Sequence, residues 1–136
     1  MELTARGLNR ALLARQLLLR REALTVPDAV RRIVGLQAQE PASPYLAMWN
    51  RIADFDPSEL DAAFADATVV KAQLMRVTLH AVHAADHPAF HNAMWYPLRA
   101  ARVGDPRFTS SGLTKEDAYS LVPRLLEFTA EPRSAA

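Results

Sequence analysis

The spacing of apolar residues changes once along this 136-residue chain, and the change limits the fold more than any other sequence feature. Before residue 67, apolar residues recur every three or four positions, as in helices that bury one face. Residues 69–75 and 77–83 are instead rich in β-branched and apolar residues that roughly alternate, as in two paired strands. Arg76 and Val77 make an unfavourable turn between them, because valine resists positive φ. The chain is therefore predicted to be mainly helical with one β-hairpin.

Four helices are predicted before the hairpin. The first covers residues 8–21, which contain no glycine or proline and place leucines on one face. The other three begin at residues that commonly cap helices, which are Thr25, Ser43 and Asp56. Helices followed by a hairpin are the order of elements in a winged helix-turn-helix, so the predicted fold class is mainly α with a β-hairpin, of the winged-helix type.

The predicted domain boundary follows residue 104. A fifth helix runs from about residue 86 to 103 and ends at Gly104, and residues 104–113 form a loop rich in glycine, proline and serine. We expect a winged-helix domain over residues 1–104. Residues 105–136 are expected to form a linker, a helix and a tail that resemble the start of a second, incomplete winged-helix unit.

The last predicted helix starts at Thr114 and is expected to break at Pro123, because an interior proline costs about 3 kcal/mol. Its apolar residues would lack most of their packing partners in an incomplete unit. We therefore predict that residues 114–128 fold back on the first unit or mediate self-association.

Composition and pattern exclude several classes of function. Without cysteine there is no disulfide, thiolate metal site or cysteine nucleophile. No apolar run approaches the ~20 residues that span a bilayer, and the N-terminus lacks the pattern of a signal peptide, which predicts a soluble, cytoplasmic protein without membrane contact. No glycine-rich phosphate loop is present. No metal and no cofactor are predicted, since four histidines without further ligands do not form a metal-binding pattern; they are His80, His83, His87 and His91.

The net charge of +1 conceals an uneven distribution. Residues 1–35 carry seven arginines against three acids, whereas residues 36–66 carry one arginine against six acids. Guanidinium groups match phosphate oxygens, so the basic segment is a candidate for contact with double-stranded DNA. The alternative is that the two segments neutralise each other. The candidate DNA-binding residues, one of them in the hairpin turn, are Arg10, Arg20, Arg21, Arg31, Arg32 and Arg76.

Three stretches of the sequence resemble the AlkZ-like winged-helix DNA glycosylases. They are Gly35-Leu36-Gln37-Ala38-Gln39-Glu40-Pro41, Ser43-Pro44-Tyr45 and Leu74-Met75-Arg76-Val77-Thr78-Leu79-His80. The resemblance extends over nearly the whole chain, but over only the N-terminal part of a typical member. It implies one part of a DNA-cradling repair or self-resistance enzyme. In such an enzyme paired glutamines, here Gln37 and Gln39, act in hydrolysing the glycosidic bond of an N7-alkylated purine.

The spacing of Gln37 and Gln39 suits that role only in an extended backbone. Residues two apart on a helix point ~200° away from each other, whereas in a strand they project to the same side. Pro41 disfavours helix at Glu40, and Gly35 weakens helix before the motif. The sequence therefore permits extended backbone across the motif, which would bring both amides together.

Neutral glutamine side chains can hold a water molecule by donating and accepting hydrogen bonds. That suffices for a cationic N7-alkylguanine, which is a good leaving group without protonation. The structural alternative is that both amides cap backbone groups where a helix ends. Three functions stay open: a DNA glycosylase, a winged-helix DNA-binding or interaction module without chemistry, and a truncated member with no activity of its own.

Overall fold

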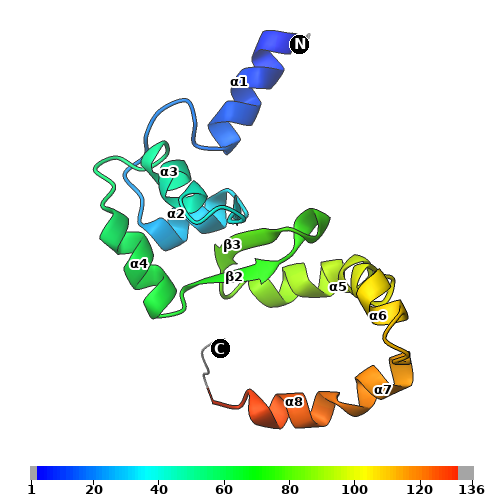
Figure 1. Ribbon diagram of the computed structural model, residues 1–136. Coiled ribbons are helices and arrows are strands. Elements are labelled where there is room, and N and C mark those ends of the chain that lie inside the picture. The colour runs from blue at the N-terminus through cyan, green and yellow to red at the C-terminus, as the bar shows by residue number, and fades with distance from the viewer. Residues whose placement is uncertain (1–2, 132–136) are drawn as a thin grey trace. The chain divides into compact units, whose positions relative to one another are not determined.

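The computed structural model describes residues 3–131, so the end of the predicted tail, residues 132–136, lies outside the described residues (Figure 1). The chain divides into two compact units between Trp95 and Tyr96. This division falls inside a helix, and the expected domain boundary after residue 104 stays a prediction. In the part of the chain that the structure describes, no helix is long and apolar enough to cross a membrane.

The first unit packs three helices against a three-stranded antiparallel sheet with the order β1-β3-β2. Helix α2 contacts β3, α3 contacts β1 and α4 contacts β2, and Figure 1 shows these helices beside the hairpin. This arrangement is winged-helix-like, as predicted. The elements are α1 (Ala5–Arg15), α2 (Val26–Arg32), β1 (Leu36–Gln37), α3 (Ser43–Trp49), α4 (Pro57–Ala65), β2 (Val69–Gln73), η1 (Met75–Val77) and β3 (Leu79–His83).

Local capping explains where the helices of the core begin. The hydroxyl of Thr25 accepts a hydrogen bond from the Asp28 N–H at 3.3 Å, and the carboxylate of Asp56 accepts one from the Ser58 N–H at 2.8 Å. Helices α2 and α4 therefore start where the sequence predicts. Helix α3 also begins at Ser43, but without a side-chain cap.

The predicted helix over residues 8–21 is wrong at both ends. Helix α1 begins after Thr4 and ends at Arg15. Leu17 then takes a positive φ of 57° and is only 2% exposed. Burying a leucine contributes about 1.5–3 kcal/mol, which offsets the cost of about 1–2 kcal/mol for left-handed backbone. The leucines predicted to share the buried face are exposed; they are Leu8, Leu12, Leu18 and Leu19.

The sequence predicts two strands, and β1 is a third. It runs antiparallel to β3, where Leu36 pairs with Ala81 and Gln37 pairs with His80. Gly35 permits the close approach of the two strands. A Cβ atom at this position would lie 2.8 Å from Val82 Cγ1 and 3.2 Å from the Ala81 carbonyl oxygen. Strand β1 can therefore pair with β3 because the residue before it has no side chain.

The hairpin strands are shorter than predicted, because β2 ends at Gln73 and β3 begins at Leu79. Between them, Arg76 and Val77 have φ angles of 55° and 59°. Left-handed backbone costs about 1–2 kcal/mol per residue, so the unfavourable turn expected from valine is confirmed. The carbonyl of Thr78 closes the turn by accepting a hydrogen bond from the N–H of residue 74 at 3.0 Å.

The second unit is helical over its described part. Helix α5 ends before Gly104, as predicted, and Thr114 caps α7 in a capping box with Asp117. Pro123 lies in the first turn of α8, so the predicted break is confirmed. The elements are α5 (His87–Val103), α6 (Pro106–Thr109), α7 (Lys115–Ser120) and α8 (Val122–Phe128).

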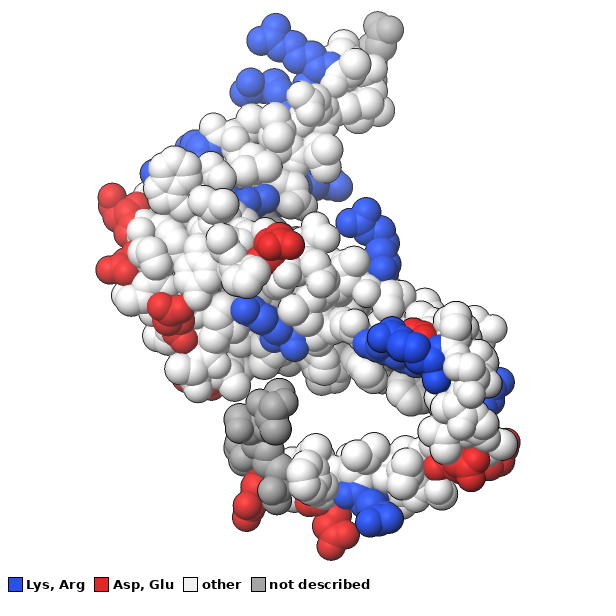
Figure 2. Space-filling model, viewed as in Figure 1, with Lys and Arg blue, Asp and Glu red and all other residues white. Residues whose placement is uncertain are grey.

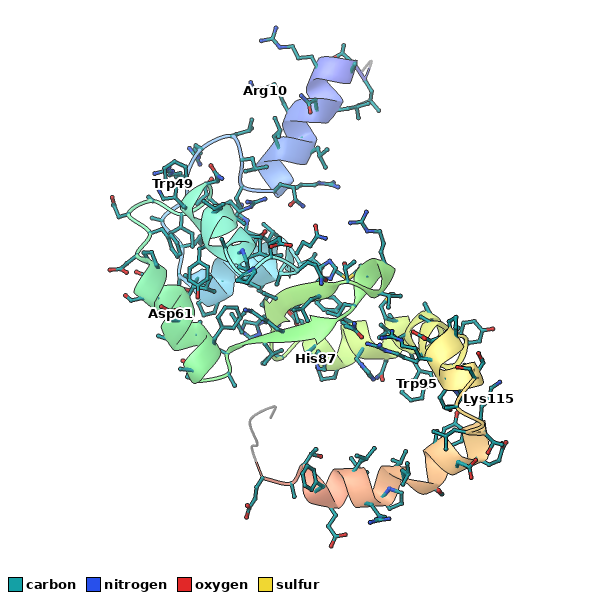
Figure 3. All side chains as sticks on the ribbon, viewed as in Figure 1. Arg10, Trp49, Asp61, His87, Trp95 and Lys115 are labelled. Carbon is teal, nitrogen blue, oxygen red and sulfur yellow. The ribbon has the colours of Figure 1, made fainter. Side chains whose placement is uncertain are left out.

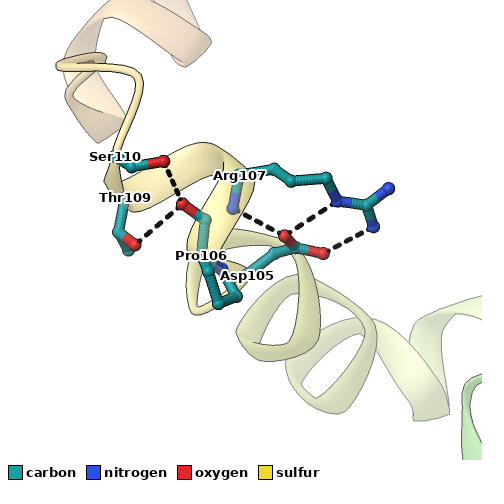
Figure 4. Close-up of polar contacts among 5 residues, drawn as sticks. All are labelled: Asp105, Pro106, Arg107, Thr109 and Ser110. Atoms are coloured by element: carbon teal, nitrogen blue, oxygen red, sulfur yellow. Dashed lines mark hydrogen bonds and ion pairs between the residues drawn. The ribbon is translucent and has the colours of Figure 1, made fainter.

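Helix α6 forms inside the segment predicted to be a loop (Figure 4). Asp105 caps it by accepting a hydrogen bond from the Arg107 N–H at 2.8 Å. The same carboxylate accepts from Arg107 Nε at 3.0 Å and from its terminal nitrogen at 2.8 Å. These hydrogen bonds lower the pKa of Asp105 to about 2.

We expect Gly35→Ala to lower the free energy of unfolding by about 1–2 kcal/mol, because the new methyl group meets Val82 Cγ1. Urea unfolding of the wild type and the variant measures this difference. The control is the same substitution in a Val82→Ala background, which removes the contacting atom and should reduce the cost. An equal cost in both backgrounds would contradict the close approach of β1 to β3.

The Asp105 cap should disappear in acid. Because the folded-state pKa is lowered from 3.8 to about 2, the cap is fully present above pH 4 and is lost as the pH falls towards 2. The amide proton shift of Arg107, followed by NMR between pH 5 and 1.5, reports the hydrogen bond. A titration midpoint near 4, the value of an unpaired carboxyl, would show that the cap does not form.

Candidate functional site

Gln37 is the last residue of β1, and Gln39 follows it two residues later, in a bend. Leu36 and Ala38 are buried whereas the two glutamines are exposed, so exposure alternates with the period of a strand. Gln37 is paired with His80 of β3. The chain has therefore left the helix at the motif, as the sequence permits, and both glutamines are exposed at the edge of the sheet; that the two amides converge stays a prediction.

The two amides differ in their hydrogen bonding. Gln39 Oε1 accepts a hydrogen bond from the Leu79 N–H at 3.2 Å, which leaves its NH₂ group as a donor for other molecules. Within residues 3–131, the side chain of Gln37 has no hydrogen-bond partner. One amide is thus anchored as a donor and the other is free to turn. Such a pair can both donate to and accept from a bound water molecule.

His80 shares the side of the sheet from which Gln37 projects. Directly paired residues of antiparallel strands point to the same face, and His80 is the partner of Gln37. The side chain is 7% exposed, and its Nδ1 lies 2.9 Å from the Thr78 carbonyl oxygen. Sequence reasoning considered His80 only as a metal ligand, because its position beside the glutamines depends on the register of β1 and β3.

Three of the candidate DNA-binding arginines, Arg10, Arg20 and Arg32, line one hollow of about 490 Å³. Arg20 Nε lies 3.1 Å from the carboxylate of Glu22, which lines the same hollow. Arg10 and Arg32 have no acidic partner in the described chain. Figure 3 shows Arg10 on α1, and Figure 2 shows basic side chains around this helix.

The other three arginines do not line this hollow. The guanidinium group of Arg21 lies over the ring of Trp49, 4.3 Å from its centroid. Arg31 forms an ion pair with Asp86 at 3.1 Å. Arg76 is exposed in the hairpin turn.

Two side chains with shifted pKa values connect elements of the first unit. The hydrogen bond to Asp61 of α4 raises the pKa of Tyr45 in α3. Burial lowers the pKa of Arg51, which donates hydrogen bonds to the carbonyls of Gln16 and Ala47 at 2.9 Å each. Both contacts support the scaffold on which β1 rests.

Among residues 3–131, no group of three or more side chains could hold a metal ion. His87 and His91 share one face of α5, as their spacing predicts, with ring centroids 5.7 Å apart. His91 also lies edge-on to Trp95, at 5.8 Å between centroids. These rings make aromatic contacts along the helix.

Comparison with known proteins connects this arrangement to a family. Residues 30–136 match the family model of the AlkZ-like DNA glycosylases. A solved structure, the DNA glycosylase AlkZ of Streptomyces sahachiroi, matches with a TM-score of 0.79 and 25% sequence identity over 94% of this chain. This chain spans 34% of the AlkZ chain. A search of curated proteins gave no match.

The matched range includes both glutamines and all three strands of the sheet. The structural match includes the mainly helical, winged-helix-like arrangement. The resemblance found in the sequence is confirmed, and the chain belongs to the AlkZ-like DNA glycosylase family.

Proposed function

We propose that this protein is a DNA glycosylase unit that hydrolyses the N-glycosidic bond of N7-alkylated purines in double-stranded DNA. The observation that carries the proposal is the placement of Gln37 and Gln39, both exposed and two residues apart, where β1 ends at the edge of the sheet. Membership of the AlkZ-like family and the likeness to AlkZ support the reaction class.

The chemistry fits neutral amides. N7 alkylation makes the purine cationic, so the departing base is already activated and needs no acid. The protein has to position a water molecule and tolerate positive charge on the sugar in the transition state. The anchored NH₂ group of Gln39 donates to the water oxygen, while Gln37 is free to accept from the water.

The arginines supply a route to the phosphate backbone. Arg10 and Arg32 line the same hollow without acidic partners in the described chain, so both charges are available for phosphate oxygens. The other arginines of the first two helices and their connection are exposed but already have partners. Arg20 contacts Glu22, Arg21 lies over Trp49, and Arg31 is paired with Asp86. We therefore assign the larger share of the DNA affinity to Arg10 and Arg32, with Arg76 in the hairpin turn.

The hollow also favours a second candidate function, a winged-helix DNA-binding module without chemistry. Phosphate contacts through Arg10 and Arg32 need no glutamine, so this function and the glycosylase make different predictions for glutamine variants.

We expect the wild type to release N7-methylguanine from a duplex in a single-turnover assay, and the double variant Gln37→Ala/Gln39→Ala to lose at least about 100-fold in rate. The reason is the loss of the donors and acceptors that hold the water. Duplex affinity should stay within twofold of the wild type.

Gln73→Ala is the matched control. Gln73 lies in the same sheet, on β2, but it is paired with residue 79 of β3, whereas Gln37 is paired with residue 80. It should retain the rate of the wild type. Equal base release by the wild type and the double glutamine variant would remove the catalytic assignment and leave the DNA-binding module.

Arg10→Ala and Arg32→Ala should each weaken duplex binding and reduce the slope of log affinity against log salt by about one, because each removes one phosphate contact. Fluorescence anisotropy over 50–300 mM salt measures the slope. Arg107→Ala, whose guanidinium group is already paired with Asp105, should leave it unchanged. A wild-type slope near zero would exclude phosphate contacts altogether.

We also propose that residues 114–128 mediate self-association, because α7 and α8 expose a series of large apolar side chains. These are Tyr119, Leu121, Val122, Leu125, Leu126 and Phe128. Sedimentation equilibrium should show a dimer that Leu125→Glu/Leu126→Glu converts to a monomer, while Arg124→Glu does not. A wild type that stays monomeric at all concentrations would contradict this surface.

A further inference from the structure

His80 is a buried titratable side chain beside Gln37, and the water-holding role of the two glutamines does not use it. His80 is 7% exposed and lies in β3 opposite Gln37. Cβ atoms of directly paired residues in antiparallel strands are about 5 Å apart, so the imidazole and the Gln37 amide are within reach of one small molecule.

Hydrogen bonding decides which nitrogen of the His80 ring carries the hydrogen. Nδ1 lies 2.9 Å from the Thr78 carbonyl oxygen, and a carbonyl oxygen can only accept. Nδ1 is therefore the donor, and the neutral ring has its lone pair on Nε2. The turn of the hairpin fixes this carbonyl, because it also accepts from the N–H of Leu74 at 3.0 Å.

The second nitrogen is accessible. Nε2 of His80 makes no hydrogen bond within residues 3–131. In the same residues, no buried side-chain nitrogen or oxygen lacks a partner. Together these facts require that Nε2 is reached by solvent. A largely buried imidazole thus presents one basic atom to solvent from the face of the sheet that contains Gln37.

An attacking water molecule becomes more acidic as its bond to carbon forms, and a base stronger than an amide oxygen speeds the loss of its proton. Gln39 Oε1 already accepts from the Leu79 N–H, and neither amide oxygen takes up a proton near neutral pH. A neutral imidazole does take one up. Resting on the proposed glycosylase function, we infer that His80 is a catalytic residue whose Nε2 accepts a proton from the attacking water.

The step balances without a further reactant. The water oxygen bonds to C1′ of the nucleotide while the C1′–N9 bond breaks. The electron pair of that bond stays on N9 and neutralises the cationic base. One water proton passes to Nε2 of His80 and from there to solvent, and the products are the free alkylated base and an abasic sugar.

Two variants separate the proton acceptor from the structural hydrogen bond. In His80→Asn the amide NH₂ takes the place of Nδ1 and can still donate to Thr78, but Nε2 is absent. In His80→Gln the amide oxygen lies near the position of Nε2. We expect the single-turnover rate to fall about 100-fold or more in His80→Asn and to stay within threefold of that lowered value in His80→Gln, because an amide oxygen near the position of Nε2 accepts a hydrogen bond but does not take up a proton. Duplex affinity should be unchanged in both.

His83→Asn is the matched control. His83 lies on the same strand, but its offset of three residues from His80 places it on the other face. It should keep the rate of the wild type. A His80→Asn variant within threefold of the wild-type rate overturns the inference while the glutamine variants still test the proposed function. A wild type that releases no base overturns both.

A measurement on the wild type covers the case in which the variants do not fold. Two-bond ¹H–¹⁵N spectra of the protein labelled at histidine report the tautomer directly. The inference requires hydrogen on Nδ1 of His80 and a shift of the Nε2 resonance when a duplex containing an abasic site is added. Hydrogen on Nε2 in the neutral ring, or no shift on binding, would overturn it.

Discussion

The antiparallel pairing of residues 36–38 with β3 is the interaction on which the candidate site depends. It turns a segment with one glutamine on either side of Ala38 into a row of alternating buried and exposed residues. The Ala38 N–H donates to the Leu79 carbonyl at 2.8 Å, and the Leu79 N–H donates to the side chain of Gln39 at 3.2 Å. One residue of β3 thus fixes both the backbone and the anchored amide. Gly35 makes the approach possible.

The charges of the candidate site suit a cationic base within DNA, whose phosphate backbone is negatively charged. The amides of Gln37 and Gln39 are neutral, so they add no positive charge next to an alkylated purine. The arginines lie elsewhere, around the hollow between α1 and α2 and in the hairpin turn, where they can contact phosphates. In the proposed function, affinity for DNA and chemistry on the base therefore depend on separate groups of residues.

Local signals in the sequence predict most of the helix boundaries, because a cap such as Thr25 or Asp56 acts within three residues. These local signals do not predict structure that depends on contacts between residues far apart in the sequence. Leu17 ends α1 by entering a core that later helices supply, and β1 obtains its hydrogen bonds from residues more than 40 positions away. The register that brings His80 beside Gln37 cannot be read from either segment alone, so the glutamines were predictable from their motif and the histidine was not.

The proposed function requires that Gln37 and Gln39 contact the damaged nucleotide. A duplex with N7-methylguanine on a 2′-fluorinated sugar would test it, because the fluorine destabilises positive charge on the sugar and slows base release. We predict that the side-chain amide ¹H–¹⁵N resonances of both glutamines shift with this duplex and stay in place with an undamaged duplex of the same sequence. Equal shifts with the two duplexes, or shifts confined to the arginines around the hollow, would contradict it.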